Sequence, residues 1–161
     1  MSQHTEKIGV FVDVQNIYYT TRDVFGRSFN YRTLWQFLSS KGDIVLANAY
    51  AIDNNDESQK KFQNALRHIG FNIRLKPYIQ RTDGSSKGDW DVGIAVDMLQ
   101  QSSSLDRIFL LSGDGDFDLL VEAMQNKHRV PVEVYGVSAL TADSLKQAAS
   151  CFHPITESLL I

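Results

Sequence analysis

The chain contains little cysteine and histidine, and this limits the sites that it can build. Its 161 residues include one cysteine, Cys151, and four histidines at widely separated positions. A single cysteine excludes an internal disulfide. Without a second thiol, the scattered histidines do not predict a zinc site.

Long apolar runs are also lacking. No segment approaches the roughly 18 consecutive apolar residues that a membrane helix requires, so no membrane partner is expected. The N-terminus places a strand-like run directly after a polar start, without the basic region, long apolar stretch and cleavage site of a secretory signal. A cytoplasmic location is therefore predicted.

The composition is that of an ordinary globular domain, with 43% hydrophobic and 22% charged residues. At this length one domain over residues 1–161 is expected, because no repeat, low-complexity tract or linker-like stretch indicates a second. The formal net charge of −3 is not that of a uniformly basic nucleic-acid-binding protein. Basic residues are nevertheless concentrated between residues 67 and 87, where the only acid is Asp83. A local basic surface beside an acidic pocket is one interpretation, and solvated faces of ordinary elements are the other.

Apolar runs alternate with amphipathic segments along the whole chain. The apolar runs predict strands at Ile8–Val14, Ile44–Ile52, Phe71–Tyr78, Arg107–Leu111 and Val132–Val137. The amphipathic segments predict helices at Ile17–Val24, Arg32–Ser40, Ser58–Ile69, Asp91–Gln101, Phe117–Lys127 and Ala142–Cys151. Gly42 and Gly70 stand where glycine caps of two helices are expected. This alternation indicates an α/β fold with a parallel sheet covered on both faces, in which ligands bind at the carboxyl ends of the strands.

Short acidic clusters lie at the ends of these strands or at a helix start. They are Asp13 with Asn16 in FVDVQN, Asp89 and Asp91 in KGDWD, and Asp114, Asp116 and Asp118 in SGDGDFD. If the first and fourth strands are neighbours, Asp13 and Asp114 lie side by side and the helix start at Asp91 faces the same crevice. Carboxylates about 4 Å apart repel one another by roughly 4 kcal/mol at a surface-like dielectric unless a cation lies between them. The pattern therefore predicts a site for Mg²⁺ or Mn²⁺, which suit ligands that are all carboxylates.

Several of these residues also have structural explanations. Asp13 ends an apolar strand, where a charge is costly unless it is paired or binds a metal. Asn16 precedes an amphipathic run and is equally suited to cap a helix. Asp89 and Asp91 both lie near a helix start, so compensation of the helix dipole is a sufficient explanation for one of them. Asp97 lies on a different helical face from Asp91, so a packing contact behind the site is expected for it.

The segment SGDGDFD allows the same two kinds of interpretation. Gly113 and Gly115 are expected to let the backbone turn sharply, so that Asp114 and Asp116 project from the turn as ligands. Asp116 is also a candidate N-cap of the next helix. Asp118 either compensates the helix dipole or binds a second metal ion.

Three residues are candidate substrate contacts. Lys87, in a polar loop that begins near Arg81, can hold a phosphate as a point charge, and Arg81 is expected to contact the same polyanion. Ser112 is expected to bond to a ligand or phosphate, although a serine in a turn commonly bonds only to nearby backbone. The apolar tail from Leu159 to Ile161 is expected to pack either on the sheet edge or on a second copy of the chain, as in a homodimer.

Taken together, the motifs resemble the NYN domain, a branch of the PIN-like nuclease superfamily, in its LabA-like form. The matching segments are D-x-x-N from Asp13 to Asn16, K-G-x-x-D from Lys87 to Asp91, A-V-D-M from Ala95 to Met98 and S-G-D-G-D-F from Ser112 to Phe117. The resemblance runs from Ile8 to Phe152. It implies a Rossmann-like three-layer α/β/α sandwich with a mainly parallel five-stranded sheet of order 3-2-1-4-5. KGDWD has one residue more than the Lys-Gly-x-Asp of relatives, so Asp89 and Asp91 both stay candidate ligands.

The resemblance further implies a Mg²⁺- or Mn²⁺-dependent ribonuclease. Its catalytic residues here would be Asp13, Asn16, Asp91, Asp114 and Asp116, of which the four aspartates bind metal. The expected reaction hydrolyses RNA to 5′-phosphate and 3′-hydroxyl ends. Two alternatives stay open: a non-catalytic RNA-binding regulatory protein with this fold, and a metal-dependent phosphatase of the haloacid dehalogenase type. Gln15 stands where the phosphatases have a second aspartate.

Overall fold

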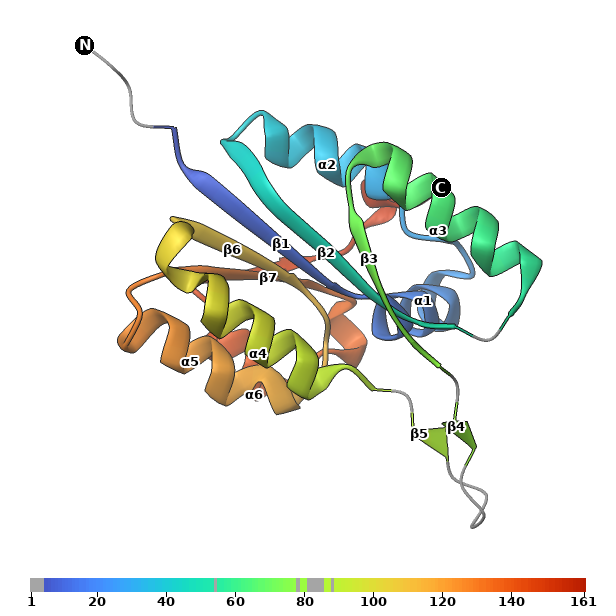
Figure 1. Cartoon of the computed structure of the whole chain (residues 1–161). Helices are drawn as coiled ribbons and strands as arrows, with labels where there is room; N and C mark the ends of the chain where they lie inside the picture. The colour runs from blue at the N-terminus through green and yellow to red at the C-terminus, as the bar shows by residue number, and fades with distance from the viewer. Residues whose placement is uncertain (1–4, 54, 78, 81–85, 88) are drawn as a thin grey trace.

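A six-stranded parallel sheet forms the centre of the computed structural model, which describes residues 5–53, 55–77, 79–80, 86–87 and 89–161 (Figure 1). The strand order is β3-β2-β1-β6-β7-β8. The bounds are Lys7–Asp13 for β1, Asp43–Asp53 for β2, Asn72–Pro77 for β3, Arg107–Leu111 for β6, Val132–Gly136 for β7 and Cys151–Pro154 for β8. Two short strands, β4 (Ile79–Gln80) and β5 (Ser86–Lys87), pair antiparallel outside this sheet.

Helices cover both faces of the sheet, as Figure 1 shows. On one face lie α1 (Val14–Phe25), α2 (Tyr31–Ser39) and α3 (Glu57–Ile69), and on the other lie α4 (Asp91–Gln101), α5 (Asp118–Asn126) and α6 (Asp143–Ala148). Short 3₁₀ turns are η1 (Ser102–Ser104), η2 (Gly115–Phe117), η3 (Ser138–Leu140) and η4 (Glu157–Leu159). Within the described part of the chain, no helix has the length and apolar character needed to cross a membrane.

The central strand β1 is apolar from Ile8 to Val12 because both of its faces are buried there. Val10 and Val12 pack with the helices α1 to α3, whereas Phe11 packs with α4 and α5 on the opposite face. None of the three is exposed to solvent. Parallel strands buried on both faces require such continuous apolar runs, and charges stand only at the two ends of the strand, at Lys7 and Asp13.

The parallel α/β fold is confirmed, but the sheet has six strands instead of five. The predicted helix Ala142–Cys151 was wrong in its last part, because α6 ends at Ala148 and the chain then pairs with β7 as β8. The segment CFHP gave no strand signal, since it is short, lies at the edge of the sheet and ends in proline, which edge strands tolerate. Val14 begins α1 instead of ending β1. Tyr78, predicted to end the third strand, lies outside the described residues.

Of the two predicted glycine caps, one is confirmed. Gly70 ends α3 with φ of 137°, which side chains rarely adopt. Gly42 does not cap α2, whose C-cap is Ser40 in an ordinary helical conformation. At Gly42 the constraint is space instead, because a Cβ atom would lie 2.8 Å from the carbonyl oxygen of Glu6.

The C-terminal tail closes against the segment that joins α1 to α2. Phe29 forms an isolated antiparallel bridge with Leu160, and the N–H of Asn30 donates to the carbonyl of Leu159 at 2.7 Å. Leu160 is 6% exposed, whereas Ile161 is 72% exposed. Most of the apolar tail therefore packs within its own chain, and the homodimer stays a prediction.

This packing makes the contribution of the tail measurable. Leu160→Ala is expected to lower the free energy of unfolding by about 2 kcal/mol, the lower end of the range for buried leucines, because it empties a packed site. Ile161→Ala is the matched control and should change it by less than about 0.5 kcal/mol. Chemical denaturation of both variants is the measurement. Equal effects would show that the tail is not packed as described.

Candidate metal centre

Three carboxylates converge where β1 and β6 end side by side. The two strands are parallel neighbours with Val12 opposite Leu111, so Asp13 and the segment that follows Leu111 reach the same edge. The helix α4 starts at Asp91 beside them. One carboxylate oxygen from each of Asp13, Asp91 and Asp114 lies within 4.8 Å of the other two. The structure thus brings together residues that are up to 101 positions apart in the sequence, from Asp13 to Asp114.

Asp13 is held by two hydrogen bonds. Its Oδ1 accepts from the backbone N–H of Asn16 at 3.3 Å, and its Oδ2 accepts from the hydroxyl of Ser112 at 3.1 Å. Asp13 is thereby the N-cap of α1, so the cap role predicted for Asn16 was wrong. The Oδ1 atom of Asn16 instead accepts from the backbone N–H of Gly113 at 2.9 Å, which ties the start of α1 to the loop after β6.

Ser112 lies beneath the acidic cluster. Its side chain is 0% exposed, and its hydroxyl donates to Asp13 while it accepts from the backbone N–H of Asp114 at 3.1 Å. In the structure the hydroxyl is therefore engaged with groups of the chain itself, and the contact of Ser112 with substrate stays a prediction. Ser112 links the carboxylate of Asp13 to the backbone of Asp114.

The glycines of SGDGDFD are needed for close packing. The only glycines with positive φ among the described residues are Gly26 and Gly70, so the turn at Gly113 and Gly115 does not depend on a backbone conformation that only glycine adopts readily. A Cβ atom on Gly113 would lie 2.8 Å from the carbonyl oxygen of Leu140. The loop that carries Asp114 therefore packs directly against the backbone at Leu140.

The three acids of this segment have different places. Asp114 is in the triad, and its Oδ1 also accepts from the backbone N–H of Asp116 at 2.9 Å. Asp116 is exposed and is not among the three clustered carboxylates, so its role as a metal ligand stays a prediction. Asp118 accepts from the N–H of Leu119 at 2.6 Å at the start of α5, which is the helix-end position expected of a dipole-compensating acid.

Asp91 is positioned by the residue before it. The indole N–H of Trp90 donates to the carbonyl of Ala51 at 2.8 Å, and its ring lies 5.3 Å from that of Tyr50. A Cβ atom on Gly93 would lie 2.5 Å from the Trp90 ring, so this glycine allows the ring to pack on α4. The sequence reasoning missed this anchor, although a tryptophan between two acids in KGDWD was a signal.

Asp89 and Asp97 flank the triad differently. Asp89 is exposed, its Oδ1 accepts from the N–H of Asp91 at 3.4 Å, and its charge acts on both Asp13 and Asp91. Asp97 is not part of the triad. Its carboxylate accepts hydrogen bonds from the hydroxyl of Tyr50 at 2.8 Å and from the guanidinium of Arg74 at 2.6 Å. Asp97 thus makes the packing contact expected of it.

Basic residues also reach this end of the sheet. Lys76 lies with its Nζ atom 4.4 Å from the centre of the Trp90 ring and donates to the carbonyl of Asp89 at 3.2 Å. Arg74 lies 5.7 Å from the same ring centre. Arg81 lies outside the described residues, and of Lys87 only the backbone, in β5, is described.

The electrostatics of the cluster favour protons when no cation is bound. Burial, the charges of Asp114 and Asp89, and a side-chain hydrogen bond with Asp114 raise the pKa of Asp91 to about 7. Burial also raises the pKa of Asp13, against the lowering effect of its hydrogen bonds with Asn16 and Ser112. A proton or a metal ion relieves the same repulsion.

The donor set fits a hard divalent cation. All three side chains offer oxygen, the ligand that Mg²⁺ and Mn²⁺ prefer, and Mg²⁺ binds oxygen at about 2.0–2.1 Å while keeping several waters. Separations up to 4.8 Å between the oxygens require only a small inward movement of the side chains. The cluster can therefore hold one such ion.

These features define an α/β protein of Rossmann-like topology with a cluster of three carboxylates at the point where strand order reverses. Residues 7–156 match the family model for the NYN domain, and the chain belongs to the NYN domain family, as its motifs indicated. It is 26% identical over 156 residues to the low amplitude and bright protein LabA of Synechococcus elongatus, covering 92% of this chain and 83% of that protein. The crystal structure of a protein of unknown function from Vibrio parahaemolyticus is similar with a TM-score of 0.94 and 47% identity, over 100% of this chain and 99% of that one.

The raised pKa of Asp91 predicts how stability depends on pH in the absence of metal. Because the folded-state pKa of about 7 exceeds the ordinary 3.8, the folded protein binds this proton more tightly than the unfolded chain does. The resulting stabilisation is fully present below about pH 4 and is lost as the pH rises through about 7. Asp91→Asn should therefore raise the melting temperature in EDTA, and the increase should be larger at pH 8 than at pH 5.

Asp23→Asn is the matched control, because Asp23 is an exposed aspartate on α1. Its melting temperature should follow that of the wild-type protein across the same pH range. Parallel curves for Asp91→Asn and the wild-type protein would contradict the proposed repulsion at this carboxylate.

Proposed function

We propose that this protein is a divalent-metal-dependent ribonuclease that cleaves RNA to 5′-phosphate and 3′-hydroxyl ends. The observation that carries the proposal is the convergence of Asp13, Asp91 and Asp114 at the ligand-binding edge of an NYN domain. When bound, Mg²⁺ or Mn²⁺ supplies an acidified water and neutralises charge on the scissile phosphate. The substrate class is inferred from the family and from the basic residues beside the cluster.

The residues of the chain have separate tasks in this proposal. Asp13, Asp91 and Asp114 hold the cation, and the hydrogen bonds of Asn16 and Ser112 keep the two strand ends together so that the ligands are preorganised. Such positioning matters because the chemistry depends on alignment of the attacking water with the phosphate.

The exposed acids have supporting tasks. Asp116 lies at the rim and is a proposed ligand of a second ion or of its water, near the leaving 3′-oxygen. Asp89 reinforces the negative potential that attracts the cations.

The RNA path is proposed to cross the end of β3. Lys76 places positive charge against the ring of Trp90, next to the start of α4, and Arg74, which also pairs with Asp97, lies beside the same ring. Contacts of this kind with phosphates carry no sequence information, so cleavage without strong sequence preference is expected. Arg81 and Lys87, from the following segment, are proposed to extend the same path.

Metal binding is the first test. Mn²⁺ should raise the melting temperature of the wild-type protein, because an ion that binds only the folded state stabilises it by mass action. The variant with Asp13→Asn, Asp91→Asn and Asp114→Asn together should show no shift, while Asp23→Asn should keep the full shift. Differential scanning fluorimetry over a Mn²⁺ titration provides the measurement. An undiminished shift in the triple variant would place the ion elsewhere.

Cleavage is the second test and uses two single variants. Asp114→Asn should lower single-turnover cleavage of a labelled RNA by about a hundredfold or more, because loss of a metal ligand weakens stabilisation of the transition state. Asp118→Asn should cost less than about fivefold, the effect of roughly 1 kcal/mol of helix-dipole compensation. RNA binding should be retained by both variants.

The outcomes of the cleavage assay distinguish the proposed nuclease from its alternatives. Full activity of Asp114→Asn would overturn the proposed mechanism, and equal losses would make Asp118 a ligand of a second ion. Wild-type protein that binds RNA without cleaving it would indicate the regulatory RNA-binding alternative. Hydrolysis of small phosphate monoesters in place of RNA would indicate the phosphatase alternative.

A further inference from the structure

A second group of metal-ligating side chains lies on the edge strands β7 and β8. Glu133 is directly opposite Cys151 in the register of these strands, and His153, two residues further, lies on the same face as Cys151. One ligand atom from each of Glu133, Cys151 and His153 lies within 4.8 Å of the other two. The cluster thus combines an oxygen, a sulfur and a nitrogen donor.

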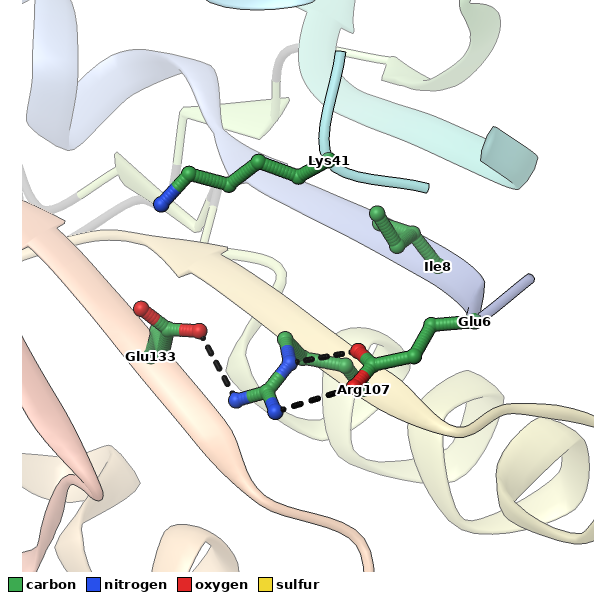
Figure 2. Close-up of a pocket in the computed structure, with 5 residues that line it drawn as sticks. All are labelled: Glu6, Ile8, Lys41, Arg107 and Glu133. Carbon is green, nitrogen blue, oxygen red and sulfur yellow. Dashed lines mark hydrogen bonds and ion pairs between the residues drawn. The ribbon is translucent and has the colours of Figure 1, made fainter. Parts of the chain in front are cut away.

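The carboxylate of Glu133 is held in place from one side. Its Oε2 accepts from Arg107 at 2.9 Å, and the same guanidinium donates to both carboxylate oxygens of Glu6, at 2.7 and 3.2 Å (Figure 2). The other oxygen, Oε1, lies 2.6 Å from Nε2 of His153. Glu133 is only 12% exposed, so its position is largely fixed before any ligand arrives.

The imidazole is oriented by an aromatic neighbour. The ring of Tyr135 stacks on that of His153 with centroids 4.6 Å apart and an angle of 22° between the planes. This contact directs Nε2 toward Glu133. Cys151 is exposed, which gives an ion access to the site from solvent.

We propose that Glu133, Cys151 and His153 form a binding site for Zn²⁺. Thiolate, carboxylate and neutral imidazole together carry two negative charges, which a divalent cation neutralises, and the Arg107 charge is already balanced by Glu6. Sulfur and nitrogen donors select Zn²⁺ over Mg²⁺. Three protein ligands leave a fourth tetrahedral position for water or an external ligand.

The geometry is close to what such a site needs. Bonds of about 2.0–2.3 Å in a tetrahedron place neighbouring donor atoms roughly 3.3–3.8 Å apart. The three donors are already within 4.8 Å, and the Glu133 to His153 distance of 2.6 Å must open by only about 1 Å. An ion would thus replace the hydrogen bond between these two side chains.

This site is separate from the aspartate cluster. Arg107 begins β6 and Glu6 precedes β1, so the network lies toward the amino ends of the strands, opposite the edge that carries Asp13. A pocket of about 340 Å³ there is lined by Glu6, Ile8, Lys41, Arg107 and Glu133 (Figure 2). Zinc was not predicted from the sequence, because one cysteine and scattered histidines give no spacing motif. The pairing of β8 with β7, which was not predicted either, is what brings the three ligands together.

Cobalt absorption provides a sharp test, because Cys151 is the only thiol in the chain. Titration of reduced, intact protein with Co²⁺ should produce a thiolate-to-cobalt charge-transfer band that saturates at one ion per chain and that Zn²⁺ displaces. Cys151→Ser should abolish the band. His153→Gln and Glu133→Gln should weaken Co²⁺ binding by more than the roughly 10–100-fold that loss of an outer hydrogen bond costs.

Two controls separate this site from other metal binding. His68→Gln removes an exposed histidine on α3 and should leave the band unchanged. Asp114→Asn should also leave it unchanged, so the result does not depend on the proposed nuclease activity. Circular dichroism of each variant verifies folding.

Three results would overturn the proposal. One is the absence of a charge-transfer band in the wild-type protein, and another is a band of full strength in His153→Gln. The third is a band that appears only as light scattering reports dimers, which would assign Cys151 to an ion shared between two chains.

Discussion

The parallel pairing of β1 with β6 is the constraint on which the site depends. It places the ends of two buried strands side by side, and the charges that follow those strands have no room to separate. The resulting repulsion between carboxylates destabilises the metal-free, fully ionised state. The folded state withstands this repulsion because the apolar layers on both faces of the sheet bury many side chains. A cation bound among the carboxylates would relieve this repulsion. The relief would contribute to the free energy of binding, so the fold itself favours an ion at this position.

The hydrogen bonds around the cluster explain why it keeps its shape despite that repulsion. Ser112 connects Asp13 to the backbone of Asp114, and Asn16 connects α1 to Gly113. The bonds from Ser112 to Asp13 and from Gly113 to Asn16 join the β1 side of the site to the β6 side. Buried polar networks that are fully satisfied in this way rigidify their surroundings, so the ligands need little reorganisation when an ion enters.

Much of this arrangement could be predicted from the sequence because it follows from strand ends and crossover handedness. The convergence of Asp13, Asp91 and Asp114 followed from the positions of the apolar runs, the rule for parallel sheets and the strand order that the resemblance to the NYN domain implied. Trp90 and β8 could not be predicted in the same way. The contact of Trp90 with Ala51 is set by tertiary packing, and the segment at Cys151 becomes a strand only because β7 offers it an unpaired edge. Long-range partners of this kind leave no local period in the sequence.

The bridge between Phe29 and Leu160 has a consequence for the order in which the molecule folds. The two residues are 131 positions apart (160 − 29), so the loop between them is among the longest that the chain can close. The entropic cost of closing a loop grows with its length. This cost must be offset by burial of apolar side chains, which is complete only after the sheet has formed. The layer of helices beside β1 is therefore sealed late, and local opening of the molecule should begin at this junction.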